Sequence, residues 1–146
     1  MQHNLEIRQA EKKDLVQLTA LMRELGYPAT PAEMQERMDA IGAHPDYVTL
    51  LACRGGAVVG MLGASRHYYY ERNGSYVRIL ALVTHAANRK TGVARALLSA
   101  IESWAKKQGA VSLILNCGNR EERAVAHRFY ANRGFRPKST GYVKML

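Results

Sequence analysis

Cysteine is scarce in this chain, which has two among its 146 residues, Cys53 and Cys117. Neither the cysteines nor the five histidines show the close spacing of metal ligands, and there is no H-x-x-x-H pair. We therefore predict no metal site. Because two isolated cysteines are too few for a disulfide framework, we expect buried, reduced thiols.

Long apolar runs are missing as well. No segment approaches the ~18 consecutive apolar residues of a membrane helix, and the N-terminus lacks a cationic stretch followed by an apolar run. We expect a soluble, cytoplasmic protein with no membrane partner. A chain of 146 residues, 47% of them hydrophobic, can build one core, so we predict a single domain over residues 1–146.

Acidic residues are outnumbered: 12 Asp and Glu against 21 Lys and Arg give a net charge of +9 and a pI near 9.8. Such a charge suits nucleic acid, an anionic cofactor or an acidic acceptor. The sequence has no helix-turn-helix pairing, zinc-finger spacing or aromatic sheet motif for RNA, so nucleic acid is the weaker explanation. A homodimer is left open.

The most informative stretch that is present reads R-K-T-G-V-A, over residues 89–94. A strand-like run over residues 76–83 leads into it, and apolar residues at helical spacing follow it. Gly92 and Ala94 keep bulky side chains away from the first helical turn, where free backbone N–H groups favour an anion. Because Arg89 adds a fixed charge, a pyrophosphate fits this place.

Hydrophobic periodicity predicts the remaining elements. Strands are expected over residues 5–9, 47–53, 57–65, 75–84 and 111–115, with two edge strands over 135–137 and 141–146. Helices are expected over residues 11–25, 31–41, 92–109 and 120–132. The strands on either side of the third helix should be parallel and form a βαβ unit with a site at their carboxyl ends. The order predicts an α/β (α+β) domain.

The pattern R-x-x-G-x-A between a strand and a helix resembles the pyrophosphate loop of the GCN5-related N-acetyltransferase (GNAT) superfamily, with Arg89, Gly92 and Ala94 in its three places. A second pattern, N-x(7)-H-R-F-Y-x(3)-G-F from Asn119 to Phe135, resembles the later motif of that superfamily. Two motifs at the expected separation are far more specific than either alone. The resemblance implies a central mixed, mostly antiparallel sheet with a βαβ acetyl-CoA-binding core and flanking helices.

The resemblance also implies acetyl-CoA as the cosubstrate and transfer of its acetyl group to a primary amine. The residues that it assigns to the cofactor are Leu82, Val83, Thr84, Arg89, Lys90, Thr91, Gly92, Val93, Ala94, Arg95 and Asn119. A helix N-cap role explains Asn119 equally well. Family resemblance further implies that two parallel strands splay apart, frequently at a β-bulge, and leave backbone donors near Leu82 for the oxyanion.

Tyr130 is the catalytic candidate, because it fills the tyrosine position of the second motif, whose hydroxyl lies near the CoA sulfur in the family. A tyrosine with the usual pKa of about 10 is protonated at neutral pH and suits an acid that protonates the leaving thiolate. The alternative interpretation is packing of the last helix on the sheet.

The sequence departs from the common GNAT pattern at the position of the general base. Many GNAT enzymes carry a glutamate on the strand before the cofactor loop, but residues 75–83 contain none. Glu71, Glu121 and His85 are possible substitutes, and a water relay or an acceptor that arrives neutral is equally open.

Tyrosines and cations gather between residues 66 and 78. Tyr68, Tyr70 and Arg78 are predicted to bind the acceptor, in a pocket suited to a small amine that also bears an acidic group. Edge-strand packing is the alternative for the two tyrosines. A looser similarity to aminoalkylphosphonate N-acetyltransferases also favours a small acceptor.

The sequence thus favours an acetyl-CoA-dependent N-acetyltransferase for a small-molecule amine. A peptide or protein amine is the alternative acceptor. A non-catalytic CoA-binding module is the alternative from another class, and the absent strand carboxylate is the feature that points to it.

Overall fold

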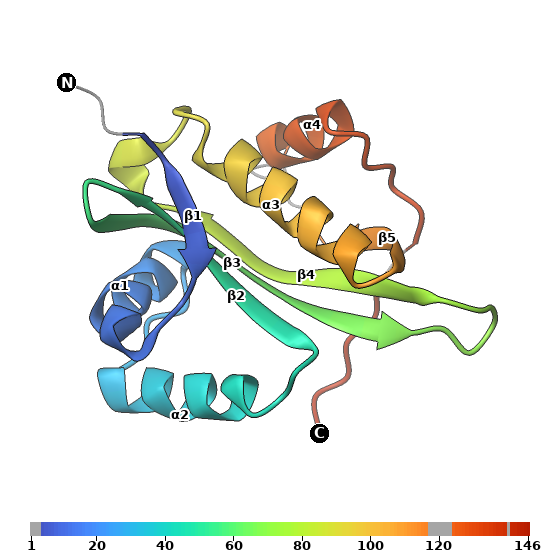
Figure 1. Ribbon diagram of the computed structural model, residues 1–146, viewed down its shortest axis with the longest axis horizontal. Helices are drawn as coiled ribbons and strands as arrows, with labels where there is room; N and C mark the ends of the chain where they lie inside the picture. Colours follow the sequence, from blue (N-terminus) through green and yellow to red (C-terminus); the bar gives the residue numbers. More distant parts are fainter. Residues whose placement is uncertain (1–3, 117–123, 140) are drawn as a thin grey trace. The chain divides into compact units, whose positions relative to one another are not determined.

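The structure is a computed structural model that describes residues 4–116, 124–139 and 141–146 (Figure 1). The chain divides into two compact units, Met1–Ile114 and Leu115–Leu146. Within these described ranges, no helix is long and apolar enough to cross a membrane.

A five-stranded mixed sheet is the centre of the first unit. Its strands lie in chain order, β1 (Glu6–Gln9), β2 (Tyr47–Arg54), β3 (Ala57–Tyr68), β4 (Ser75–Thr84) and β5 (Ala110–Leu115). Strands β1 to β4 are antiparallel, each to the next. Gly55 and Gly56, with φ of 55° and 83°, make the tight turn between β2 and β3. The mixed, mostly antiparallel sheet and the α/β class are as predicted.

Helix α3 (Val93–Lys107) packs on one face of the sheet and connects β4 to β5 (Figure 1). It buries one stripe of side chains, Val93, Leu97, Leu98, Ile101 and Ala105. Gly60 on β3 permits this packing, because a Cβ there would lie 2.6 Å from Val93 Cγ1 and 3.1 Å from the Val83 carbonyl oxygen. The first turn of α3 therefore lies close against β3.

Helices α1 (Leu15–Leu25) and α2 (Pro31–Gly42) cover the opposite face (Figure 1). A capping box begins α2: Glu33 N donates to Thr30 Oγ1 at 3.1 Å, and Thr30 N donates to Glu33 Oε1 at 2.9 Å. The core below these helices includes Cys53, whose burial raises the pKa of its thiol. Cys53 is therefore buried as predicted, whereas Cys117 lies outside the described residues.

A β-bulge interrupts the pairing of β3 with β4. Gly63 pairs with Ala81, but the next residue, Ala64, pairs with Ile79, so Leu80 is an extra residue on β4. The sequence left this feature open. The bulge lies two residues before Leu82.

The first helix begins later than predicted. Residues Lys12–Asp14 form a 3-10 turn, and α1 begins at Leu15 instead of residue 11. The reason is the Asp14 carboxylate, which accepts a hydrogen bond from Glu11 N at 2.7 Å and pairs with Arg8 at 2.8 Å. These contacts fix a separate turn before the helix.

The second unit contains α4 (Ala124–Asn132), which ends as predicted before Gly134, a residue with φ of 88°. Residues 120–123 of the predicted helix lie outside the described residues. The prediction of two edge strands here is wrong, because residues 135–139 and 141–146 contain no strand. Pro137 has no N–H for a ladder, and the apolar side chains from Tyr142 onward are exposed.

Candidate active site

The loop after β4 leads to the N-terminus of α3. Gly92 is the N-cap with φ of 89°, no side chain of the described residues caps it, and the first turn has no acidic residue. The first helical bond is Ala96 N to Gly92 O at 3.0 Å, so the N–H groups of residues 93–95 precede the helical ladder. A Cβ at Gly92 would meet nothing within 4 Å. An external anion has room here.

Positive charge surrounds this helix end. Arg89, Lys90 and Arg95 are all exposed beside it. Their charges add to the positive end of the α3 dipole, so the region attracts an anionic group.

Arg54 fastens the loop to the end of β2. Its Nη1 donates to Thr91 Oγ1 at 2.8 Å, and its Nη2 donates to the Thr91 carbonyl at 2.9 Å. Thr91 Oγ1 also donates to the Asn88 carbonyl. Sequence reasoning missed Arg54, because 37 residues separate it from Thr91 and only the sheet register brings them together.

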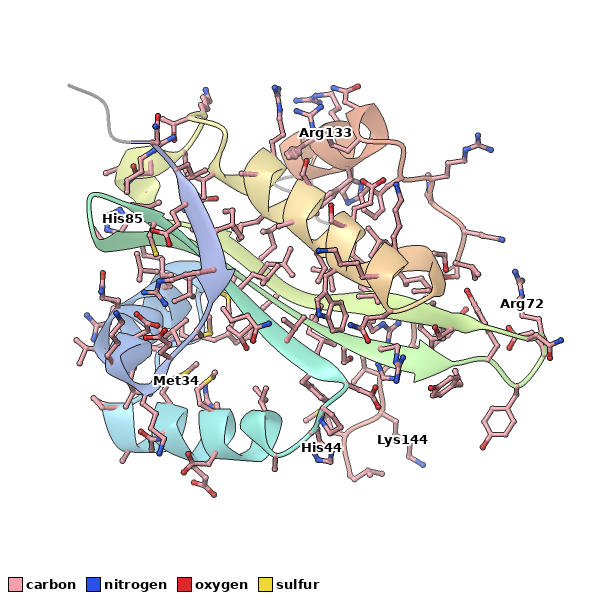
Figure 2. The ribbon with its side chains drawn as sticks, in the orientation of Figure 1. Met34, His44, Arg72, His85, Arg133 and Lys144 are labelled. Atoms are coloured by element: carbon pink, nitrogen blue, oxygen red, sulfur yellow. The ribbon has the colours of Figure 1, made fainter. Side chains whose placement is uncertain are left out.

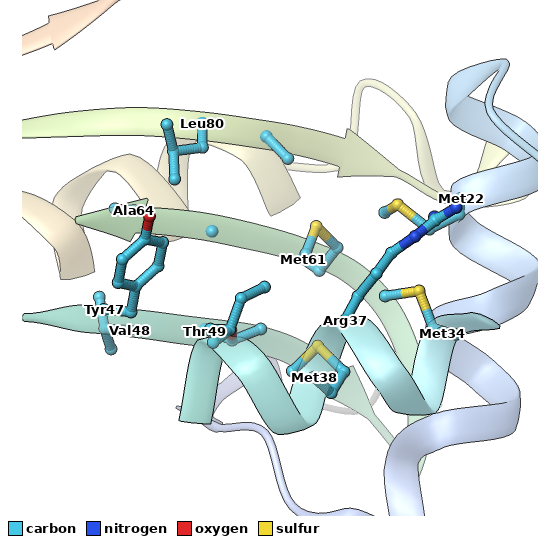
Figure 3. Close-up of a pocket in the computed structure, with 13 residues that line it drawn as sticks. Met22, Met34, Arg37, Met38, Tyr47, Val48, Thr49, Met61, Ala64 and Leu80 are labelled. Carbon is cyan, nitrogen blue, oxygen red and sulfur yellow. The ribbon is translucent and has the colours of Figure 1, made fainter. Parts of the chain in front are cut away.

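A cavity of about 150 Å³ lies under α1 and α2 and reaches the bulge of β4 (Figure 3). Four of the six methionines line it, Met22, Met34, Met38 and Met61. Figure 2 shows Met34 between α2 and α1, on the side of the sheet away from α3. The other lining residues are Arg37, Ile41, Tyr47, Val48, Thr49, Gly63, Ala64, Leu80 and Ala81. The cavity is therefore mostly apolar, with one cation.

The acceptor residues predicted from the sequence do not line this cavity. Tyr68 ends β3 and is 67% exposed, and Tyr70 lies in the bend beyond it, fully exposed. Arg72 lies at the same hairpin end, where it stacks on Tyr69 at 4.9 Å (Figure 2). Tyr68 and Tyr70 stay predictions as acceptor ligands.

Arg78 lies nearer to the cavity. It pairs across the sheet with Ser65, which in turn pairs with the cavity residue Tyr47, so these three residues share a face of the sheet. Among the described residues, its Nε is a buried donor with no hydrogen-bond partner.

Neither His85 nor Glu71, two of the three candidate bases, lines the cavity. His85 lies in the turn after β4, where Nδ1 accepts from Ala87 N at 3.2 Å and Nε2 lies 3.5 Å from Glu24 Oε1. Both ring nitrogens therefore have partners, Ala87 in the turn and Glu24 on α1. Glu71 is exposed on the β3–β4 hairpin, and Glu121 lies outside the described residues.

The second motif is described in part. Tyr130 lies on α4, with its ring 5.6 Å from that of Phe129 and 5.8 Å from that of Phe135. Phe135 N donates to the Tyr130 carbonyl at 3.1 Å and closes the helix end. Asn119 lies outside the described residues.

A model of the acetyltransferase (GNAT) family matches residues 14–135. The chain belongs to this family. A GNAT family acetyltransferase from Staphylococcus aureus subsp. aureus USA300_TCH1516 has 30% sequence identity and a TM-score of 0.85, over 97% of this chain and 98% of that one. A search of curated proteins finds no match.

More distant GNAT structures share the fold. A putative acetyltransferase from Agrobacterium tumefaciens str. C58 has 23% identity and a TM-score of 0.86, over 97% of this chain and 99% of that one. The aminoglycoside acetyltransferase AAC(6')-Iy, solved with a CoA-containing bisubstrate analogue, has 18% identity and a TM-score of 0.82, over 98% and 99%. Membership indicates an acyltransferase, whereas the similarity to aminoalkylphosphonate N-acetyltransferases stays a prediction.

Proposed function

We propose that this protein is an acetyl-CoA-dependent N-acetyltransferase that acts on the primary amine of a small molecule. The observation that carries the proposal is the N-terminus of α3. No side chain of the described residues caps it at Gly92, its first turn has no acidic residue, and three exposed cations lie beside it. In a GNAT protein this is the place for the cofactor pyrophosphate, held by backbone N–H groups and Arg89.

The rest of the cofactor would follow β4. The backbone of Leu82, Val83 and Thr84 would pair with the pantetheine arm. The bulge at Leu80 would leave a backbone N–H unpaired, and this N–H could donate to the acetyl carbonyl oxygen as that oxygen gains charge. Tyr130 would protonate the leaving thiolate. Because the cavity residues Leu80 and Ala81 belong to the bulge, an acceptor in the cavity would have its amine near the acetyl group.

The test of cofactor binding is Gly92→Glu. We expect acetyl-CoA affinity to fall by at least about tenfold, ~1.4 kcal/mol, since a carboxylate would stand where the pyrophosphate binds. Titration calorimetry measures it. Gly109→Glu is the matched control: it changes a glycine with φ of 79° and open space past the other end of α3, with the same charge change. Equal affinity in folded Gly92→Glu would place the cofactor elsewhere.

A further inference from the structure

The lining of the methionine cavity limits which amines it can accept. Methionine side chains are flexible and polarisable, so they adapt to aliphatic groups and make favourable contacts with aromatic rings. A mostly apolar cavity of about 150 Å³ holds a group of roughly six or seven carbon atoms. The size fits the side chain of leucine, methionine or phenylalanine.

The charge of the cavity excludes a different set of acceptors. No aspartate, glutamate or histidine of the described chain lines it, and Arg37 is its one charged lining residue. A polycationic acceptor would enter an apolar space beside a like charge, with no carboxylate to pair with its ammonium groups. Aminoglycoside-like amines are therefore disfavoured.

Arg37 is available for an anion. It lies on α2 and reaches toward Met22 along the cavity (Figure 3). Among the described residues no hydrogen bond or ion pair of its guanidinium is found, although Glu33 lies one helical turn away. An acceptor carboxylate would give this cation its partner and fix the orientation of the bound molecule.

On the basis of the proposed function, we infer that the acceptor is an amino acid with an apolar side chain of about seven heavy atoms or fewer. The side chain enters the methionine cavity, the carboxylate pairs with Arg37, and the neutral amine faces the bulge. The nitrogen lone pair forms a bond to the acetyl carbon as the carbon–sulfur bond breaks. The nitrogen loses one proton, the thiolate gains one, and the products are an N-acetylamino acid and CoA.

A cycle of two substrates and two enzymes tests the role of Arg37. Leucine and leucinamide differ in the carboxylate, and their kcat/KM ratio is measured by thiol release for the wild type and for Arg37→Gln. Dividing the ratio for Arg37→Gln by the ratio for the wild type cancels the different intrinsic reactivities of the two amines. We expect Arg37→Gln to lower the ratio about tenfold through KM, the low end for a bond to a charged group, because Arg37 is solvent exposed.

Two further variants sharpen the test. Arg23→Gln removes an exposed cation at the end of α1, outside the cavity lining, and should leave the ratio unchanged. Met38→Ala enlarges the cavity at a half-buried position and should shift preference from leucine toward phenylalanine. If Arg78→Gln lowers the ratio and Arg37→Gln does not, the assignment to Arg37 is wrong.

The outcomes separate this inference from the proposed function. Faster acetylation of tobramycin or glucosamine 6-phosphate than of leucine, methionine and phenylalanine would overturn the inference and leave an N-acetyltransferase. Acetyl-CoA binding without acetylation of any amine in the panel would overturn both. Preferred turnover of the apolar amino acids together with the Arg37 effect supports the inference.

Discussion

Lys90 is the one described residue other than glycine with a positive φ, at 62°. A left-handed backbone costs a residue with a side chain roughly 1–2 kcal/mol, so neighbouring contacts must hold it. The two hydrogen bonds from Arg54 to Thr91 directly follow it and supply such a restraint. Gly92 is also left-handed, so two residues with positive φ shape the loop directly before α3.

Tyr130 is tested by a change of one oxygen atom. Tyr130→Phe keeps the ring that contacts Phe129 and Phe135 and removes the hydroxyl. Removal of a positioned acid costs about 10²–10⁴-fold in rate, and we expect the low end because a thiolate is a tolerable leaving group. Steady-state kcat with a good acceptor measures the effect.

The pH profile separates catalysis by Tyr130 from packing. An acid must be protonated, so the wild-type kcat should fall at alkaline pH as the tyrosine ionises, and Tyr130→Phe should lose that limb. Tyr142→Phe, in the exposed C-terminal tail, is the control. An unchanged kcat and pH profile in Tyr130→Phe would assign the hydroxyl no part in proton transfer.

At the scale of elements, we expect the contact between β3 and α3 to position the proposed cofactor loop. In Gly60→Ala the new Cβ would lie 2.6 Å from Val93, the first residue of α3. We expect a loss of about 1–3 kcal/mol in unfolding free energy, typical of overpacking, and weaker acetyl-CoA binding because the helix end moves. Urea unfolding and calorimetry measure the two effects.

Two variants control the Gly60 experiment. Val93→Ala removes the clashing methyl groups, so Gly60→Ala combined with Val93→Ala should recover part of the cofactor affinity. Gly42→Ala, at the end of α2 with open space around it, should not weaken binding. If Gly60→Ala binds acetyl-CoA as the wild type does, the close contact does not position the loop.

The elements differ in how far the sequence predicts them. The loop between β4 and α3 was predictable as structure because strand, glycine and amphipathic helix are neighbours in the chain. The methionine cavity was not, because its lining residues come from separate helices and strands. Its shape depends on the register of β3 with β4, where the extra residue Leu80 carries no local signal. The C-terminal strands were overpredicted, because a strand needs a partner that its own residues do not specify.

For the whole molecule, a net charge of +9 leaves few acidic groups to stabilise the fold. Among the described residues, Asp14 is a buried carboxylate that is only 1% exposed and that contributes to the stability of the fold. Both of its oxygens lie 2.8 Å from Arg8 nitrogens, which joins β1 to the start of α1. The side-chain hydrogen bond from Arg8 lowers the pKa of Asp14.

The stability of the protein should therefore depend on Asp14 in acid. A carboxyl group with a lowered pKa in the folded state stabilises the fold above its unfolded pKa of about 3.9, and this contribution is lost as the pH falls toward the lowered value. Asp14→Asn should cost about 3 kcal/mol at pH 7, since it leaves Arg8 without its partner in a largely buried place. Urea unfolding from pH 7 to pH 3 measures both.

Asp39→Asn is the matched control for Asp14, because it removes the same charge from an exposed position on α2 and should change stability by less than about 0.5 kcal/mol. The difference between wild type and Asp14→Asn should shrink as the pH falls below about 4, because the unfolded chain takes up a proton at Asp14 before the folded protein does. A difference that stays constant from pH 7 to pH 3 would show that Asp14 acts through its shape and hydrogen bonds and not through its charge. Acid would then unfold the protein through repulsion among its 21 Lys and Arg side chains, without a specific carboxylate.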